Sequence, residues 1–115
     1  MRHARSALAE MDYDSASFFA EQASQLFLKT RMLDEVGEIP RVHGVRELLG
    51  MLAGSTPERG RAIRSFSRRN REELRLLDDA YISARYLPTA YTKEEAAALV
   101  RLARQIRRLV AGSKT

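Results

Sequence analysis

Several residue types are scarce in this 115-residue chain, and each scarcity excludes a class of site. There is no cysteine, which rules out a disulfide scaffold, a thiol nucleophile and a cysteine metal site. The two histidines, His3 and His43, are too few and too far apart to indicate a zinc centre, so we expect no metal and no cofactor. The six glycines are scattered at predicted helix ends and form no phosphate-binding loop. No apolar run approaches the roughly 20 residues of a membrane-spanning helix, so we expect a soluble, cytoplasmic protein without a membrane partner.

Positive charge, in contrast, is abundant. Twenty basic residues against fifteen acidic ones give a net charge of +5, and seventeen of the twenty are arginines. Arginine binds phosphate through a planar fork of donors, so the balance permits a nucleotide or nucleic-acid partner without requiring one. The excess is concentrated in residues 59–75, where seven arginines stand against two glutamates.

Helical periodicity dominates the chain, and no segment alternates apolar and polar residues as a strand would. We therefore expect one all-α domain over residues 2–112, folded as an up-and-down bundle of four to five helices. The predicted helices are 2–11, 14–36, 42–53, 57–83 and 92–112.

Each long predicted helix carries an apolar seam at three- and four-residue spacings. In the second helix the predicted seam is Ala16, Phe19, Ala23, Leu26, Thr30 and Leu33. In the third it is Val45, Leu48, Leu49 and Leu52, and in the fourth it is Ile63, Phe66, Leu74, Leu77 and Tyr81, with Asn70 in the stripe. In the last it is Ala96, Leu99, Ala103, Ile106 and Val110.

Helix ends carry recognisable signals. Asp12 or Asp14 is placed to cap the second helix, and Gly37 is placed to end it. Thr56 precedes Pro57 as a cap for the fourth helix, and Thr92 forms a capping box with the glutamate three residues on.

A second stripe on the fourth predicted helix is basic. It consists of Arg61, Arg64, Arg68, Arg71 and Arg75. The stripe is interpreted either as a solvated outer face or as a surface for RNA or phosphates, whose affinity would fall as salt rises.

The sequence contains no recognisable arrangement of catalytic residues. Its acidic residues occur as adjacent pairs, and two neighbouring side chains on a helix point to different sides and do not share a site. The most unusual segment is 81–88, where Tyr81 and Tyr86 flank Arg85. A fork of donors beside aromatic faces suits a phosphate or a base. The alternative is that Arg85 pairs with a carboxylate or helix-end carbonyls and locks the loop. For His43 the alternatives are capping the following helix or contacting a neighbouring one, against direct contact with a ligand.

Three segments in this order resemble the HEPN domain, in its small prokaryotic branch. They are YDSASFFAEQASQLFLKTRML (13–33), IPRVHGVRELLGML (39–52) and LDDAYISARYLP (77–88), followed by a closing helix that starts TKEEAAAL (92–99). The resemblance covers nearly the whole chain and departs from the family where an aspartate usually follows the histidine, here Gly44. It implies a helical bundle that commonly pairs with a second copy. Members are either partners of minimal nucleotidyltransferases, as in toxin–antitoxin-like pairs, or ribonuclease toxins.

The nuclease branch carries an arginine followed four to six residues later by a histidine, and this motif does not occur here. Arg31 stands too far before His43, Arg41 too close, and no histidine follows Arg85. The resemblance carries over the polar cluster of Gln22, Lys29, His43, Tyr81, Arg85 and Tyr86, in which Arg85 would hold phosphate.

These observations favour a non-catalytic, homodimeric HEPN module that binds a nucleotide or phosphate, partners a minimal nucleotidyltransferase, or does both. One alternative is a metal-independent ribonuclease toxin using Arg85 with a displaced base such as His43, and another is a ligand-free scaffold. The dimer is expected because Phe18, Leu28 and Met32 lie off the predicted seam and need another surface to bury against.

Overall fold

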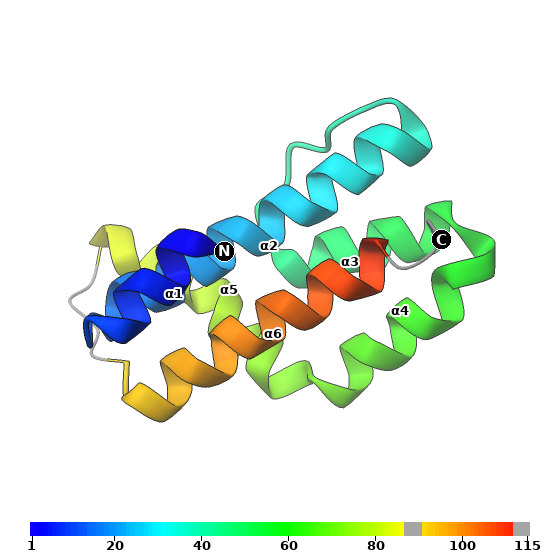
Figure 1. Cartoon of the computed structure of the whole chain (residues 1–115). Coiled ribbons are helices and arrows are strands. Elements are labelled where there is room, and N and C mark those ends of the chain that lie inside the picture. The colour runs from blue at the N-terminus through cyan, green and yellow to red at the C-terminus, as the bar shows by residue number, and fades with distance from the viewer. Residues whose placement is uncertain (87–90, 112–115) are drawn as a thin grey trace.

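The computed structural model describes residues 1–86 and 91–111, and it describes side chains for all of these except 83–86. Its helices are α1 (Arg2–Ala9), α2 (Tyr13–Val36), α3 (Val45–Ser55), α4 (Pro57–Arg69), α5 (Arg71–Tyr86) and α6 (Lys93–Ala111) (Figure 1). No strand occurs in the described ranges, which confirms the predicted all-α bundle.

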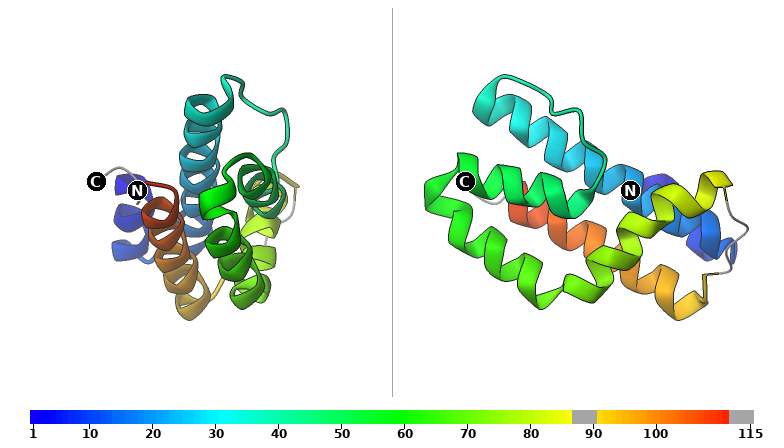
Figure 2. Two further views of the ribbon diagram at one scale, coloured as in Figure 1. Left: turned by 90° about the vertical axis from the view of Figure 1, so that its right-hand side faces the viewer. Right: turned by 180° about the vertical axis from the view of Figure 1, so that it is seen from behind.

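Helix α2 is the central element. It packs against α1, α3, α5 and α6, whereas α4 packs mainly on α3. Seen along the bundle, α1 and α6 lie on one side of α2, and α3, α4 and α5 lie on the other (Figure 2). Residues from 13 to 36 therefore meet almost every other part of the fold.

The core is built mainly of leucine and alanine from all six helices. Its largest fully buried apolar side chains are Leu28, Val45, Leu48, Leu49, Leu52, Ile63, Leu74, Leu77, Leu99, Leu102 and Ile106. The predicted seams of α3 and α6 are confirmed in full, because every residue named for them is buried.

The predicted seam of α2 is confirmed at Ala16, which is buried, and in part at Phe19 and Ala23, which are half-buried, but its last three residues are wrong. Leu26 and Leu33 are 64% and 45% exposed, and Thr30 is also exposed. The buried face instead carries small and polar residues, among them Ser17 and Ser24. Each of these hydroxyls donates to the carbonyl four residues earlier, at 2.9 and 2.8 Å, so it needs no partner on another helix.

The expectation that Phe18, Leu28 and Met32 need a partner's surface is therefore wrong for two of these residues. Leu28 and Met32 are buried within the single chain, and Phe18 is half-buried. The apolar surface left uncovered on this part of the molecule is a different one, formed by Leu26, Leu33, Val36 and Ile39.

The predicted fourth helix is two helices, separated at Asn70. The Asn70 side chain donates to the Phe66 carbonyl at 2.9 Å, and the Asn70 amide donates to the same carbonyl at 3.1 Å, so Asn70 caps the last turn of α4. The Asn70 carbonyl then accepts from the Leu74 amide at 2.8 Å and starts α5. The predicted buried stripe survives the break, since Ile63, Phe66, Leu74 and Leu77 are all buried and Tyr81 is half-buried.

Most predicted caps are confirmed. Asp12 accepts from the Ser15 amide at 3.3 Å, and Gly37 ends α2 with a positive φ of 85°. Thr92 and Glu95 exchange two hydrogen bonds of 3.0 Å as a capping box. Thr56 occupies the N-cap position before Pro57 as predicted, but its hydroxyl makes no cap bond and donates backward to the Leu52 carbonyl at 2.8 Å.

Several helix boundaries differ from prediction. Helix α1 ends at Ala9 and not at Met11, α3 runs over Val45–Ser55 and not over 42–53, and α5 continues to Tyr86 and does not end at Ser83. Helix α6 is described up to Ala111, and the predicted terminator Gly112 lies outside the described residues.

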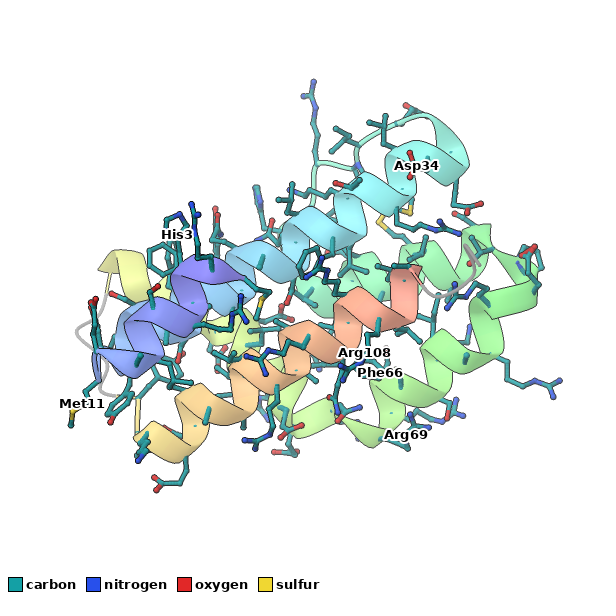
Figure 3. All side chains as sticks on the ribbon, in the orientation of Figure 1. His3, Met11, Asp34, Phe66, Arg69 and Arg108 are labelled. Atoms are coloured by element: carbon teal, nitrogen blue, oxygen red, sulfur yellow. The ribbon has the colours of Figure 1, made fainter. Side chains whose placement is uncertain are left out.

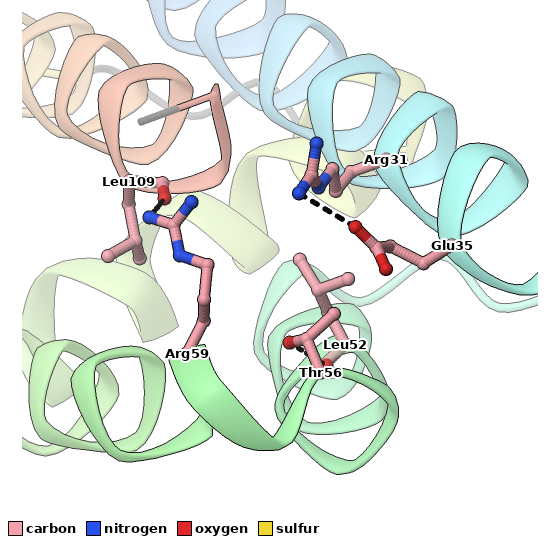
Figure 4. A network of polar contacts seen from close by, with 6 residues as sticks. All are labelled: Arg31, Glu35, Leu52, Thr56, Arg59 and Leu109. Carbon is pink, nitrogen blue, oxygen red and sulfur yellow. Dashed lines mark hydrogen bonds and ion pairs between the residues drawn. The ribbon is translucent and has the colours of Figure 1, made fainter. Parts of the chain in front are cut away.

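At the far end of the bundle, α4 holds the last turn of α6. Arg59 Nη2 donates to the Leu109 carbonyl, while Arg59 Nη1 is buried without a partner in the described part of the chain. An arginine donor at a helix C-terminus satisfies a carbonyl that has no partner within its own helix. The ion pair between Arg31 Nη2 and Glu35 Oε1, 2.7 Å long, lies opposite on α2 (Figure 4).

Candidate functional site

The most distinctive contact at the predicted polar cluster is a ring stack. The His43 imidazole lies over the Tyr81 ring with centroids 5.3 Å apart and planes only 10° from parallel. His43 comes from the segment before α3 and is exposed, whereas Tyr81 comes from α5 and is half-buried. Of the two structural roles predicted for His43, contact with a neighbouring helix is confirmed and capping is not.

The cap of α3 is supplied by Asp78 on α5. Its Oδ1 accepts from the Val45 amide at 2.6 Å, and its Oδ2 lies 3.5 Å from Arg46 Nε. Gly44 occupies the N-cap position and has no side chain to accept the first amides of the helix. Asp78 therefore fixes the start of α3, and with it the position of His43 two residues before.

Opposing effects act on the pKa of Asp78. Burial raises its pKa, and the neighbouring Asp79 charge adds to the rise. The amides of Val45 and Arg46 and the Arg46 guanidinium act in the opposite direction, because they favour the carboxylate. The carboxylate is held in place by these donors against a cost of desolvation.

A second carboxylate lies beneath the same surface. Glu21 on α2 is fully buried, and both its oxygens accept hydrogen bonds, from Gln22 Nε2 at 2.8 Å and from Gln25 Nε2. Burial raises the pKa of Glu21, and the nearby charge of Asp78 raises it further, while Lys29 lowers it. Glu21 thus links α2 electrostatically to both Asp78 and Lys29.

The structure relates four of the six predicted binding residues to two carboxylates, Glu21 and Asp78. Gln22 bonds Glu21, Lys29 interacts with Glu21, and the His43–Tyr81 stack adjoins Asp78 through α5 and the start of α3. The side chains of Arg85 and Tyr86, the other two, lie outside the described residues.

Sequence reasoning missed Glu21 and Asp78, the two carboxylates that organise the cluster. A signal existed for Glu21, because it precedes Gln25 by four residues and the pair occupies one face of a helix. Asp78 similarly precedes Tyr81 by three residues. Nothing in the sequence alone pairs Asp78 with the amides of residues 45 and 46, over thirty positions away.

The resulting surface offers three kinds of contact to a ligand. An exposed imidazole provides a flat face, Gln22 provides an exposed amide, and Lys29 provides a half-buried ammonium. Among described residues, no group of three or more acidic, histidine or cysteine side chains is arranged to hold a metal ion.

The predicted arginine stripe is exposed throughout. Arg61, Arg64 and Arg68 lie on α4, and Arg71 and Arg75 lie on α5 beyond the Asn70 break. The stripe is therefore divided between two helices and does not run along a single one. Over the part of the chain that the structure describes, no helix is long and apolar enough to cross a membrane.

Comparison with known proteins identifies the family. The family model of the HEPN domain matches residues 1–113, nearly the whole chain. No curated protein and no solved structure matches it. The match agrees with the all-helical bundle and with the resemblance of the three sequence segments. The chain belongs to the HEPN domain family.

Proposed function

We propose that this HEPN chain is a non-catalytic module that binds a nucleotide at the surface formed by Gln22, Lys29, His43 and Tyr81. The observation that carries the proposal is the near-parallel stack of an exposed His43 on Tyr81. One face of the imidazole is covered by the tyrosine, and the exposed ring offers its other face to a planar base.

Stacking of a base on an aromatic side chain contributes about 1–3 kcal/mol in nucleic-acid-binding proteins. A base stacked on His43 would extend an existing pair of rings, whose position is already fixed by the Asp78 cap. The ordering of the ring is therefore achieved before the ligand arrives, which lowers the entropic cost of binding.

The polar groups around the stack complement a nucleotide. Gln22 donates a hydrogen bond through Nε2 to Glu21, which leaves the amide oxygen of Gln22 as an acceptor at the surface. Lys29 supplies a positive charge for a phosphate. Arg85, whose side chain lies outside the described residues, is retained from the sequence prediction as a second phosphate ligand.

The positions of the side chains that could transfer a proton favour a non-catalytic role over RNA cleavage. Cleavage needs a proton-transfer group near the attacking 2′-hydroxyl. The arginine–histidine motif of the nuclease branch does not occur in the sequence, and His43 is packed against Tyr81. RNA incubated with the protein should remain intact, and cleavage lost in His43→Ala or Arg85→Ala would contradict the proposal.

Binding is tested by calorimetric titration of the protein with ATP, GTP, CTP and UTP. His43→Ala should weaken the best of these ligands by at least about tenfold, the equivalent of one lost stacking contact. The matched control is His3→Ala, because His3 is also exposed and also lies against an aromatic ring, that of Phe19 at 5.5 Å. Equal losses in both variants, or no binding to any of the four nucleotides, would refute the proposed surface.

We further propose that the chain forms a homodimer through the exposed apolar face of Leu26, Leu33, Val36 and Ile39. Leu26 and Leu33 lie seven residues apart on one side of α2 and form an apolar strip interrupted by Thr30. Gln22 and Lys29 flank this strip on the same helix, so the proposed nucleotide surface would border the interface between the two copies. A twofold axis lets such a strip bury itself on its own copy.

Sedimentation velocity at micromolar concentration should show a species of twice 13.1 kDa for the wild-type chain. Leu26→Asp should shift it to the monomer, while Ile82→Asp, which alters an equally exposed apolar residue on α5, should not. A wild-type monomer would contradict the dimer.

The second proposed partner is a minimal nucleotidyltransferase, as the family resemblance implies. A gene for such an enzyme should lie beside the gene for this chain, and the two products should co-elute in gel filtration. An adjacent nucleotidyltransferase that fails to co-elute would contradict the partnership, as would the absence of such a gene.

A further inference from the structure

A continuous basic surface crosses α6 from α4 to α1. A groove of about 430 Å³ lies between α4 and α6, and its polar lining is Arg69, Asn70, Gln105 and Arg108. A second pocket of about 370 Å³ lies between α1 and the end of α6, and its charged lining is Arg5, Arg104, Arg107 and Arg108. Arg108 lines both, so the two pockets adjoin (Figure 3 marks Arg108, Phe66 and Arg69 at the first of them).

We name this surface the α6 basic track, defined by Arg5, Arg69, Arg104, Arg107 and Arg108. No acidic side chain lines either pocket. Within the described residues, none of the five arginines takes part in an ion pair; Arg69 bonds the Ser65 hydroxyl and Arg107 lies over the Phe27 ring. The sequence explains this, because residues 59–71 and 96–111 contain ten arginines and no aspartate or glutamate.

Five guanidinium groups gathered without counter-charges repel one another, and an external polyanion would relieve the repulsion. The track spans three helices, which suits an extended polyanion with spaced charges better than a compact anion. The first groove also presents amide groups. Asn70 donates through Nδ2 to the Phe66 carbonyl, its Oδ1 accepts no bond from the described residues, and Gln105 is exposed. Base edges use such acceptors and donors, whereas sulfated sugars and lipid headgroups supply mainly anions.

We propose that the α6 basic track binds a single strand of nucleic acid, with phosphates on the arginines and a base edge at Asn70 and Gln105. This surface lies apart from the His43–Tyr81 stack, and its use does not depend on nucleotide binding there. The groove volume is that of a small-ligand pocket, roughly 300–1,000 Å³, and it accommodates one nucleotide unit at a time.

The test is fluorescence anisotropy with a labelled 20-nucleotide oligouridylate and with oligodeoxythymidylate, titrated with the full chain over a series of salt concentrations. Each phosphate contact contributes about 0.7 to the slope of log K against log salt for single strands. The double variant R69Q/R108Q should therefore lose about 1.4 from that slope, and about tenfold in affinity per arginine at low salt.

The matched control is R41Q/K93Q, which removes two exposed positive charges outside the track. It should keep the wild-type slope within about 0.4, since neither residue contacts the strand. Both double variants alter only exposed side chains, and thermal melting checks that each remains folded.

Three results would overturn the proposal. The first is no binding of either oligonucleotide at low salt, and the second is equal loss in both double variants. The third is that heparin or anionic vesicles, at matched charge, compete as strongly as unlabelled oligonucleotide. That result would show that the track binds polyanions in general.

Discussion

Replacing Asp78 by alanine removes the only acceptor that another element supplies to the first turn of α3 among the described residues. The Val45 amide, bonded at 2.6 Å, and the Arg46 amide then lose their partner, and Gly44 has no side chain to replace it. Loss of a helix cap costs about 1 kcal/mol, and a hydrogen bond to a charged acceptor about 1.5–3 kcal/mol. The exposed Arg46 guanidinium adds at most about 0.5 kcal/mol, because its side chain is 51% exposed.

Part of this loss is offset, because burial raises the pKa of Asp78 and so makes its charge costly in the folded chain. We expect Asp78→Ala to lower the free energy of unfolding by about 2 kcal/mol at pH 7. Asp78→Asn should cost about half as much, since its amide oxygen still accepts one hydrogen bond and the desolvated charge is gone.

The assay is urea unfolding followed by circular dichroism, with amide hydrogen exchange at residues 45 and 46 as a local measurement. The matched control is Asp79→Ala, because Asp79 is exposed and adjacent and should change stability by less than about 0.5 kcal/mol. If Asp78→Ala and Asp79→Ala destabilise equally, or if exchange at residue 45 does not accelerate, the capping role is refuted.

The remaining predictions concern the buried Glu21 and a pair of glycines, Gly60 and Gly50. Burial raises the pKa of Glu21 from its ordinary 4.5, so the folded chain binds this proton more tightly than the unfolded chain, and stability should fall as pH rises from 4.5 through the raised pKa. Glu21→Gln should make the urea midpoint depend less on pH over that range. An unchanged pH dependence would show that Glu21 is not the group responsible. At Gly60 an added Cβ would lie 2.7 Å from the Ala53 carbonyl oxygen, so Gly60→Ala should destabilise the chain by about 1–3 kcal/mol. At Gly50 in α3 an added Cβ has no neighbour within 4 Å, so Gly50→Ala should stabilise the chain by about 0.5–1 kcal/mol. Melting temperatures that shift in the same direction in the two alanine variants would contradict the packing described at these glycines.

The sequence predicts the elements of this fold where the local pattern and the tertiary packing agree. In α6 they agree, because the seam from Ala96 to Val110 is apolar, regular and buried as expected. In α2 they disagree, because partners on several sides bury small and polar residues such as Ser17 and Ser24. Hydrophobic periodicity cannot locate a buried face that is lined by serine and alanine.

The break at Asn70 shows a second limit. The heptad-like stripe continues across it, so the spacing of apolar residues predicts one helix. In the structure Asn70 is the C-cap of α4, and an asparagine in a helical stripe was the available signal.

For the candidate site, the family resemblance supplies His43 and Tyr81 as members of a polar cluster, and the structure shows that their rings stack and what positions them. The contributions of Glu21 and Asp78 depend on how α2, α3 and α5 pack, and residue spacing within one helix does not contain that information.

The most direct test of the central claim is a proton–nitrogen correlation spectrum of the labelled chain, titrated with whichever of the four nucleoside triphosphates binds best. The account predicts shifts at the amides of Gln22, Lys29, His43 and Tyr81, and their loss in His43→Ala. Shifts that spare these four residues, or that persist in His43→Ala with unchanged affinity, would contradict nucleotide binding on the His43–Tyr81 stack.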